Sequence, residues 1–197
     1  MTSQSELKDF EAHPLTRERW PDLEELFGKR GACAGCWCMF WRLNRSQFNQ
    51  QKGDENRRSL KKIVDSGETP GIVGYLGGVP IGWCSVAPRE SYPTLENSRI
   101  LKRIDDKHVW SIVCFFVAKQ FRRKGVTLRL IKASIDYAHG CGGNIVEGYP
   151  VEPRKGKMPD IFVYTGLASA FVKNGFTEVV RRSETRPIMR YTISRDH

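Results

Sequence analysis

Apolar and polar positions along the chain fall into alternating blocks that predict strands and helices in turn. Two strand-like runs, residues 71–76 and 79–87, meet at the Gly77-Gly78 pair, which is typical of a β-hairpin. The most apolar run, residues 109–117, leads into a short basic loop and then into an amphipathic helical pattern that extends to Tyr137. This order predicts an α/β domain in which helices flank a mixed sheet.

The remaining segments carry weaker versions of the same signals. Further strands are predicted at residues 7–10, 144–149, 176–182 and 187–193, and helices at 17–27, 53–66, 95–104 and 165–173. We expect Thr165 to cap the last helix and Asn174-Gly175 to end it. The proline-rich stretch at residues 150–159 is expected to be irregular, and the 197 residues are predicted to form one domain, 1–197.

The basic loop at residues 120–125 has the properties of an anion site. It lies where a strand gives way to a helix, so unpaired backbone N–H groups and the positive end of the helix dipole point at one place. Arg122, Arg123 and Lys124 add positive charge, and Gly125 allows a phosphate to approach the backbone closely. A purely structural alternative is a basic turn that only caps its helix.

Neither of two well-known nucleotide loops fits this site. The chain contains no G-x-x-x-x-G-K-[ST] string and no G-x-G-x-x-G string between a strand and a helix. Residues 117–130 instead resemble motif A of the GNAT superfamily of acyl-CoA-dependent N-acetyltransferases, V-x-P-x-x-R-G-x-G-[IV]-[GA] followed by a Leu-rich helix. Arg122 and Gly125 match that pattern, whereas Lys119, Arg123 and Thr127 depart from it.

The resemblance extends beyond the loop. Residues 164–176, YTGLASAFVKNGF, look like the family's motif B helix, and the Gly-Gly turn stands where the family has its β2–β3 hairpin. The resemblance implies a GNAT-like fold with a mixed, mostly antiparallel sheet flanked by helices, and acetyl-CoA as co-substrate. The cofactor-binding residues that it implies are Phe115, Phe116, Val117, Arg122, Arg123, Lys124, Gly125, Val126 and Thr127.

The resemblance also suggests catalytic groups. The backbone N–H of Val117 is expected to bind the acyl oxygen as an oxyanion donor. Glu147, on the strand after the main helix, is the predicted general base, although a solvent-facing strand carboxylate is an equally good interpretation. Ser111 or Cys114 could instead position a water, and Asp160 is a further candidate.

The catalytic acid is where the sequence departs most from the family. The family's tyrosine, four residues before the Gly-Phe pair, falls at Phe171, which has no proton to donate. Tyr164 begins the same helical segment and is predicted to take this role, with packing at the rim of a pocket as the alternative.

Three aromatic residues after the first predicted helix are candidates for the acceptor pocket: Trp37, Phe40 and Trp41. Strand alternation would place Trp37 and Trp41 on one face and Phe40 on the other. Cation–π attraction could hold an ammonium group there, but core packing is the better single interpretation of this run.

Composition and charge narrow the functional classes. The amino terminus lacks the apolar core of a signal peptide, and no run reaches about 18 apolar residues, so a cytoplasmic location without membrane association is expected. The net charge of +10 can mark a partner such as nucleic acid or an anionic ligand. The phosphates of coenzyme A account for part of this excess, so nucleic acid is not expected as a partner. Cys33, Cys36 and Cys38 lack a second cysteine pair, so no zinc or other metal is predicted.

The resemblance therefore implies an enzyme that moves an acetyl group from acetyl-CoA to a primary amine of a small molecule, as a monomer or homodimer. The alternative is a non-catalytic module with the same fold that senses acyl-CoA or binds nucleic acid. The phenylalanine at position 171 is the feature that favours this alternative.

Overall fold

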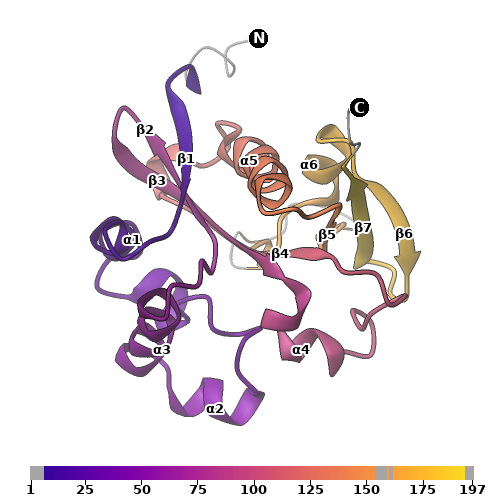
Figure 1. Ribbon diagram of the computed structural model, residues 1–197, viewed down its shortest axis with the longest axis horizontal. Helices are drawn as coiled ribbons and strands as arrows, with labels where there is room; N and C mark the ends of the chain where they lie inside the picture. Colours follow the sequence, from indigo (N-terminus) through magenta and orange to yellow (C-terminus); the bar gives the residue numbers. More distant parts are fainter. Residues whose placement is uncertain (1–6, 154–158, 160–161, 194–197) are drawn as a thin grey trace.

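A seven-stranded sheet, covered by helices on both faces, forms the centre of the molecule (Figure 1). The computed structural model describes residues 7–153, 159 and 162–193. The strands run in the order β1-β2-β3-β4-β5-β7-β6. Only the β4–β5 pair among them is parallel, so the predicted mixed and mostly antiparallel sheet is confirmed.

The elements alternate along the chain much as the hydrophobic pattern predicts. The strands are β1 (Phe10–Pro14), β2 (Ile72–Leu76), β3 (Val79–Pro88), β4 (Trp110–Val117), β5 (Ile145–Gly148), β6 (Thr177–Arg181) and β7 (Pro187–Thr192). The α-helices are α1 (Trp20–Phe27), α2 (Arg45–Gln50), α3 (Asp54–Asp65), α4 (Pro93–Glu96), α5 (Val126–Gly140) and α6 (Ala168–Lys173). Short helical turns are η2 (Gly31–Gly35), η3 (Arg89–Ser91) and η4 (Lys119–Phe121).

Two apolar cores lie on opposite faces of the sheet. On one face α1, η2 and α3 pack over residues such as Trp83 and Cys114, and on the other α5 and α6 pack over residues such as Ile112 and Phe115 (Figure 1). A Cβ atom on Gly82 of β3 would lie 3.0 Å from a methyl carbon of Val126. The missing side chain therefore lets the first turn of α5 sit directly against the sheet.

Two sequence-based expectations at the ends of elements are wrong. The first strand begins at Phe10, because Leu7 is a buried anchor in the α5-side core instead of a strand residue. The predicted helix 165–173 begins at Ala168 with Leu167 as its N-cap, so Thr165 does not cap it. The Thr165 hydroxyl instead accepts a hydrogen bond from Arg186 Nη1 at 3.1 Å.

The predicted helix at residues 95–104 is also wrong, since α4 ends at Glu96. Two carbonyl groups of the segment that follows α4 bond to arginines from elsewhere. Arg89 donates to the Leu101 carbonyl at 2.9 Å, and Arg182 donates to the Lys102 carbonyl at 2.6 Å. These long-range bonds fix the irregular segment after α4 and satisfy two of its carbonyl groups.

Within the part of the chain that the structure describes, no helix combines the length and the apolar character needed to cross a bilayer.

Candidate functional site

The parallel strands β4 and β5 separate before β4 ends. Their pairing stops at Ile112↔Gly148, although β4 continues to Val117. Beyond that point a different segment lies beside β4, because the Phe115 N–H donates to the Tyr164 carbonyl at 2.6 Å. The divergence opens one side of β4 and brings the segment around Tyr164 next to the end of the strand.

The open side of β4 presents a backbone donor at Val117. The Ala118 N–H bonds to the Ile81 carbonyl of β3, and donors alternate sides along an antiparallel pair. The N–H groups of Phe115 and Val117 therefore both point away from β3. The Phe115 N–H is used in the hydrogen bond to the Tyr164 carbonyl. The Val117 N–H has no acceptor within the described residues, which is the geometry expected of an oxyanion donor.

The basic loop connects this strand end to the start of α5. Arg122 Nε donates to the Val117 carbonyl at 3.0 Å, which folds the loop back toward the end of β4. No side chain caps the first turn of α5. The N–H groups at that turn are therefore directed at the same region as the side chains of the loop.

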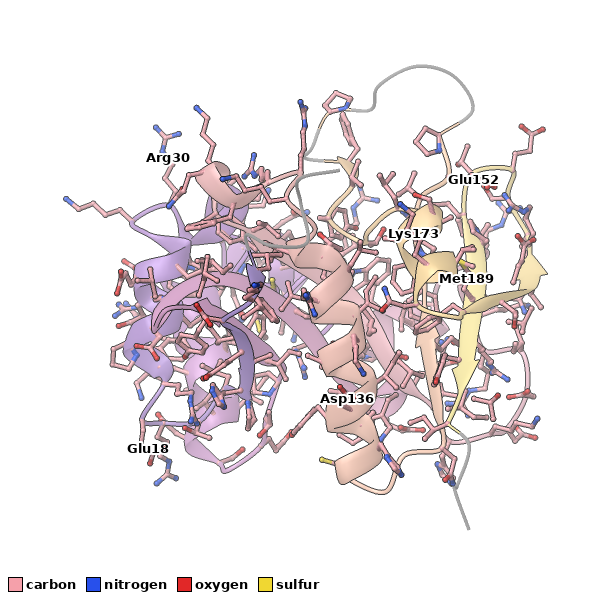
Figure 2. The ribbon with its side chains drawn as sticks, turned by 90° about the horizontal axis from the view of Figure 1, so that it is seen from above. Glu18, Arg30, Asp136, Glu152, Lys173 and Met189 are labelled. Atoms are coloured by element: carbon pink, nitrogen blue, oxygen red, sulfur yellow. The ribbon has the colours of Figure 1, made fainter. Side chains whose placement is uncertain are left out.

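Two residues of the loop have left-handed backbone conformations. Gly125 has φ of +89°, which suits glycine, and Arg123 has φ of +62°, which is uncommon for a residue with a side chain. Strained backbone of this kind clusters at ligand sites. In Figure 2, Arg30 lies toward the end of the molecule at which α5 begins, and Asp136 lies toward the other end of that helix.

Tyr164 lies on the α1 side of β4, and Phe171 lies on the α5 side. Phe171 is fully buried among Phe115 and Phe176, so this position of motif B faces the core. Burial raises the pKa of Tyr164 to about 12, although Arg186 nearby opposes the shift. The Tyr164 hydroxyl therefore keeps its proton at neutral pH and can act as a donor.

Glu147 belongs to a buried network of ionic and hydrogen bonds. Its side chain is 1% exposed. One carboxylate oxygen accepts from Arg89 at 2.9 Å and from the Tyr149 hydroxyl at 2.6 Å, and the other accepts from Arg190 at 2.6 Å. Both oxygens are therefore engaged, which favours a structural role over a general-base role.

The other candidates for proton handling share that network or lie outside it. The Ser111 hydroxyl is within 2.8 Å of the Tyr149 hydroxyl. Cys114 faces the α1-side core, where its sulfur lies 3.1 Å from that of Cys38. Asp160 lies outside the described residues.

The aromatic run after α1 forms turns instead of a strand. Trp37 and Trp41 are core residues, and Trp37 stacks on Trp20. Phe40 is 38% exposed. Its ring meets that of Tyr164 edge to face at 6.4 Å, which brings one predicted pocket residue to the predicted acid.

The six cysteines are free thiols. In the described ranges, no group of three or more His, Cys, Asp or Glu side chains is arranged to hold a metal ion. The segment that carries three of these cysteines is strained, with positive φ at Ala32, Ala34, Trp37 and Cys38.

Sequence reasoning missed three residues around the site: Arg89, Tyr149 and Arg186. Arg89 lies 58 residues before its partner Glu147, and Arg186 lies 21 residues after Thr165. No local spacing could have connected these pairs.

Comparison with solved structures gives the fold. The PaiA N-acetyltransferase of Thermoplasma acidophilum in complex with coenzyme A has 14% sequence identity and a TM-score of 0.52, with 93% of this chain and 99% of that chain covered. A GNAT-family acetyltransferase of Streptococcus agalactiae has 12% identity and a TM-score of 0.57, covering 95% and 98% of the two chains. YncA of Salmonella typhimurium, with its cofactor acetyl-CoA, has 13% identity and a TM-score of 0.54, covering 96% of each chain.

No curated protein sequence matches the chain significantly. The sequence model of the acetyltransferase (GNAT) family matches residues 37–151, which is more than half of the chain and includes β4, the basic loop and α5. With the divergent strands, the open donor at Val117 and the uncapped helix start, this match shows that the chain belongs to the GNAT acetyltransferase family.

Proposed function

We propose that the protein is an N-acetyltransferase that moves the acetyl group of acetyl-CoA to a primary amine of a small molecule, by direct attack through a tetrahedral intermediate. The observation that carries the proposal is the Val117 N–H, which points into the gap between the diverging strands β4 and β5. A donor fixed on a buried strand stabilises a developing oxyanion without reorganising.

The loop after β4 suits the pyrophosphate of coenzyme A. It combines an uncapped helix start with the exposed side chains of Arg122, Arg123 and Lys124. Charge-assisted hydrogen bonds of this type contribute about 1.5–3 kcal/mol each. The co-substrate supplies the activated acyl group and a thiolate leaving group, and the loop anchors its anionic end.

Tyr164 is the proposed proton donor to that thiolate. Its hydroxyl stays protonated at neutral pH. Its backbone carbonyl accepts a hydrogen bond from the N–H of Phe115, which lies two residues before Val117 on β4. Two residues of strand span about 6.6 Å, so Tyr164 and the oxyanion donor lie at one end of the same strand.

The general base stays a prediction. An amine with a lysine-like pKa near 10.4 is only about one part in a thousand free base at neutral pH, so deprotonation needs assistance. Glu147 could receive that proton only through the network in which Arg89, Tyr149 and Arg190 already occupy its oxygens. We therefore assign Glu147 to holding the sheet, and keep a cytoplasmic location and the small-molecule acceptor as predictions.

Calorimetry with acetyl-CoA, followed by thiol release across a panel of amines, tests the proposal. We expect acetyl-CoA to bind and at least one amine to release coenzyme A. Absence of binding at about 1 mM, a concentration that detects even weak complexes, would overturn it. Binding without thiol release from any amine would favour the acyl-CoA-sensing alternative.

Two substitutions at Gly125 locate the phosphates in the same assay. Gly125→Asp places a carboxylate at the loop and is expected to raise the Kd for acetyl-CoA at least about tenfold, or about 1.4 kcal/mol. Gly125→Ala is the matched control, because it carries the same backbone strain at φ of +89° without the charge. Equal affinities of the two variants would place the pyrophosphate elsewhere.

A further inference from the structure

Arg186 has no carboxylate partner within the described residues, unlike the interior arginines Arg89 and Arg190. Arg89 pairs with Glu96 and Glu147, and Arg190 pairs with Asp105 and Glu147. Within the described residues, the side chain of Arg186 hydrogen-bonds to the hydroxyl of Thr165, at 3.1 Å, and to the phenol of Tyr164. Neither partner neutralises the guanidinium charge.

The position of Arg186 is fixed by its neighbours. Its backbone N–H bonds to the Ser183 carbonyl at 3.2 Å, in the turn between β6 and β7. Thr165, which receives its side chain, is fully buried. The guanidinium is itself half-buried, so it is held against the segment that lies beside the end of β4. A desolvated arginine with spare donors is suited to bidentate binding of a planar anion.

The strongest charge acting on the Tyr164 hydroxyl is positive, that of Arg186. The titratable groups that act on this hydroxyl are Arg186, Cys114, Cys36 and Cys38. A hydrogen bond with Cys38, followed by burial, raises the pKa of the Cys36 thiol, and a hydrogen bond with Cys114, together with burial, raises that of the Cys38 thiol. Both thiols are therefore neutral. The main electrostatic influence on the Tyr164 hydroxyl is therefore the positive charge of Arg186.

A simple alkylammonium would be repelled by this environment. An acceptor that carries its own carboxylate would instead place that group on Arg186 while its amine faces the strand end near Val117. The exposed ring of Phe40, in contact with Tyr164, offers an apolar surface beside the same point.

We infer that the acceptor is an amino acid-like amine whose carboxylate binds Arg186, with Tyr164 and Thr165 fixing the guanidinium. This inference deepens the proposed function and rests on it. The reaction is the proposed one: the amine forms an amide bond with the acetyl group, the thioester bond breaks, and the amine's proton is lost to the base or to solvent.

Matched pairs of acceptors test the inference. The pairs are phenylalanine and phenethylamine, tryptophan and tryptamine, and 4-aminobutyrate and propylamine, and the measurement is kcat/KM by thiol release from acetyl-CoA. We expect at least one amino acid to exceed its decarboxylated partner by about tenfold or more. In Arg186→Gln that ratio is expected to fall to near one, with the Kd for acetyl-CoA unchanged.

Arg186→Lys is the second variant, because it keeps the charge but loses the two-pronged geometry, and we expect it to retain part of the preference. If either variant fails to fold, the ratio of kcat/KM between amino acid and decarboxylated amine in the wild-type protein decides the inference alone. A wild-type preference for the amines, or turnover of none of the acids while acetyl-CoA binds, would overturn the inference. So would a ratio unchanged in Arg186→Gln. Failure to bind acetyl-CoA at all would instead refute the proposed function.

Discussion

Glu147 shows how, at the scale of a single residue, position and chemical role can differ. The sequence places it correctly on the strand after the main helix, where a carboxylate could face the reaction. The structure surrounds it with two arginines and a tyrosine that come from 58, 43 and 2 residues away. Both carboxylate oxygens are occupied by these hydrogen bonds, so the contribution of Glu147 is to hold β5, β7 and η3 together.

Glu147→Gln should therefore reduce stability more than chemistry. Removing one charge from a buried network leaves Arg89 and Arg190 partly uncompensated and costs about 3–5 kcal/mol. Urea unfolding measures this loss. Glu152→Gln is the control, because it removes the same charge from a pair with Arg181 in which Glu152 is 51% exposed, and it should cost about 0–1 kcal/mol. An unchanged stability with kcat lost at all pH values would restore Glu147 as the general base.

At the scale of elements, the sequence predicted the helices and strands whose signals lie in consecutive residues, and it missed the features that depend on long-range contacts. The β2–β3 hairpin, α3 and the strand–loop–helix unit of β4 and α5 were predictable, because each signal lies within consecutive residues. The candidate loop was predictable for the same reason. The separation of β4 from β5 and the contact of Tyr164 with Phe115 depend on residues about 36 and 49 positions apart, respectively, which no spacing rule connects. Arg186 was missed for that reason, and so were the distant arginines that bond to the irregular segment after α4, where the sequence predicted a helix.

The docking of α6 on β5 gives an element-scale prediction. A Cβ atom on Gly148 would lie 2.2 Å from the ring of Phe171, which is fully buried and cannot swing away. Gly148→Ala should therefore cost about 1–3 kcal/mol through overpacking. Gly140→Ala, in the last turn of α5, meets no heavy atom within 4 Å and should be neutral or stabilising by up to about 1 kcal/mol. Urea midpoints for the two variants compare them directly, and equal midpoints would contradict the described packing of Phe171.

At the scale of the whole molecule, the excess of positive charge makes the carboxylates that pair with arginines important for stability. The chain carries a net charge of +10, yet several arginines lie inside the fold, where carboxylates compensate them. Asp105 and Glu178 each pair with an arginine, and hydrogen bonds from Arg190 and Arg181, respectively, lower the pKa values of the two carboxyl groups. Protonating such groups removes an attraction and increases the repulsion among the remaining cations.

Acid should therefore destabilise the protein in a defined pH range. Arg190 lowers the pKa of Asp105 from 3.8 to about 2. Because the folded value lies below the unfolded one, the stabilisation is fully present above about pH 4 and is lost as the pH falls toward 2. Urea unfolding at a series of pH values should show Asp105→Asn less stable than wild type at pH 6, with the difference vanishing by about pH 2. Asp136→Asn, which breaks an exposed pair with Lys132, is the control and should change stability by only about 0.3–0.5 kcal/mol. A wild-type advantage over Asp105→Asn that stays constant down to pH 2 would mean that the shape of the side chain, and not its charge, stabilises the contact with Arg190.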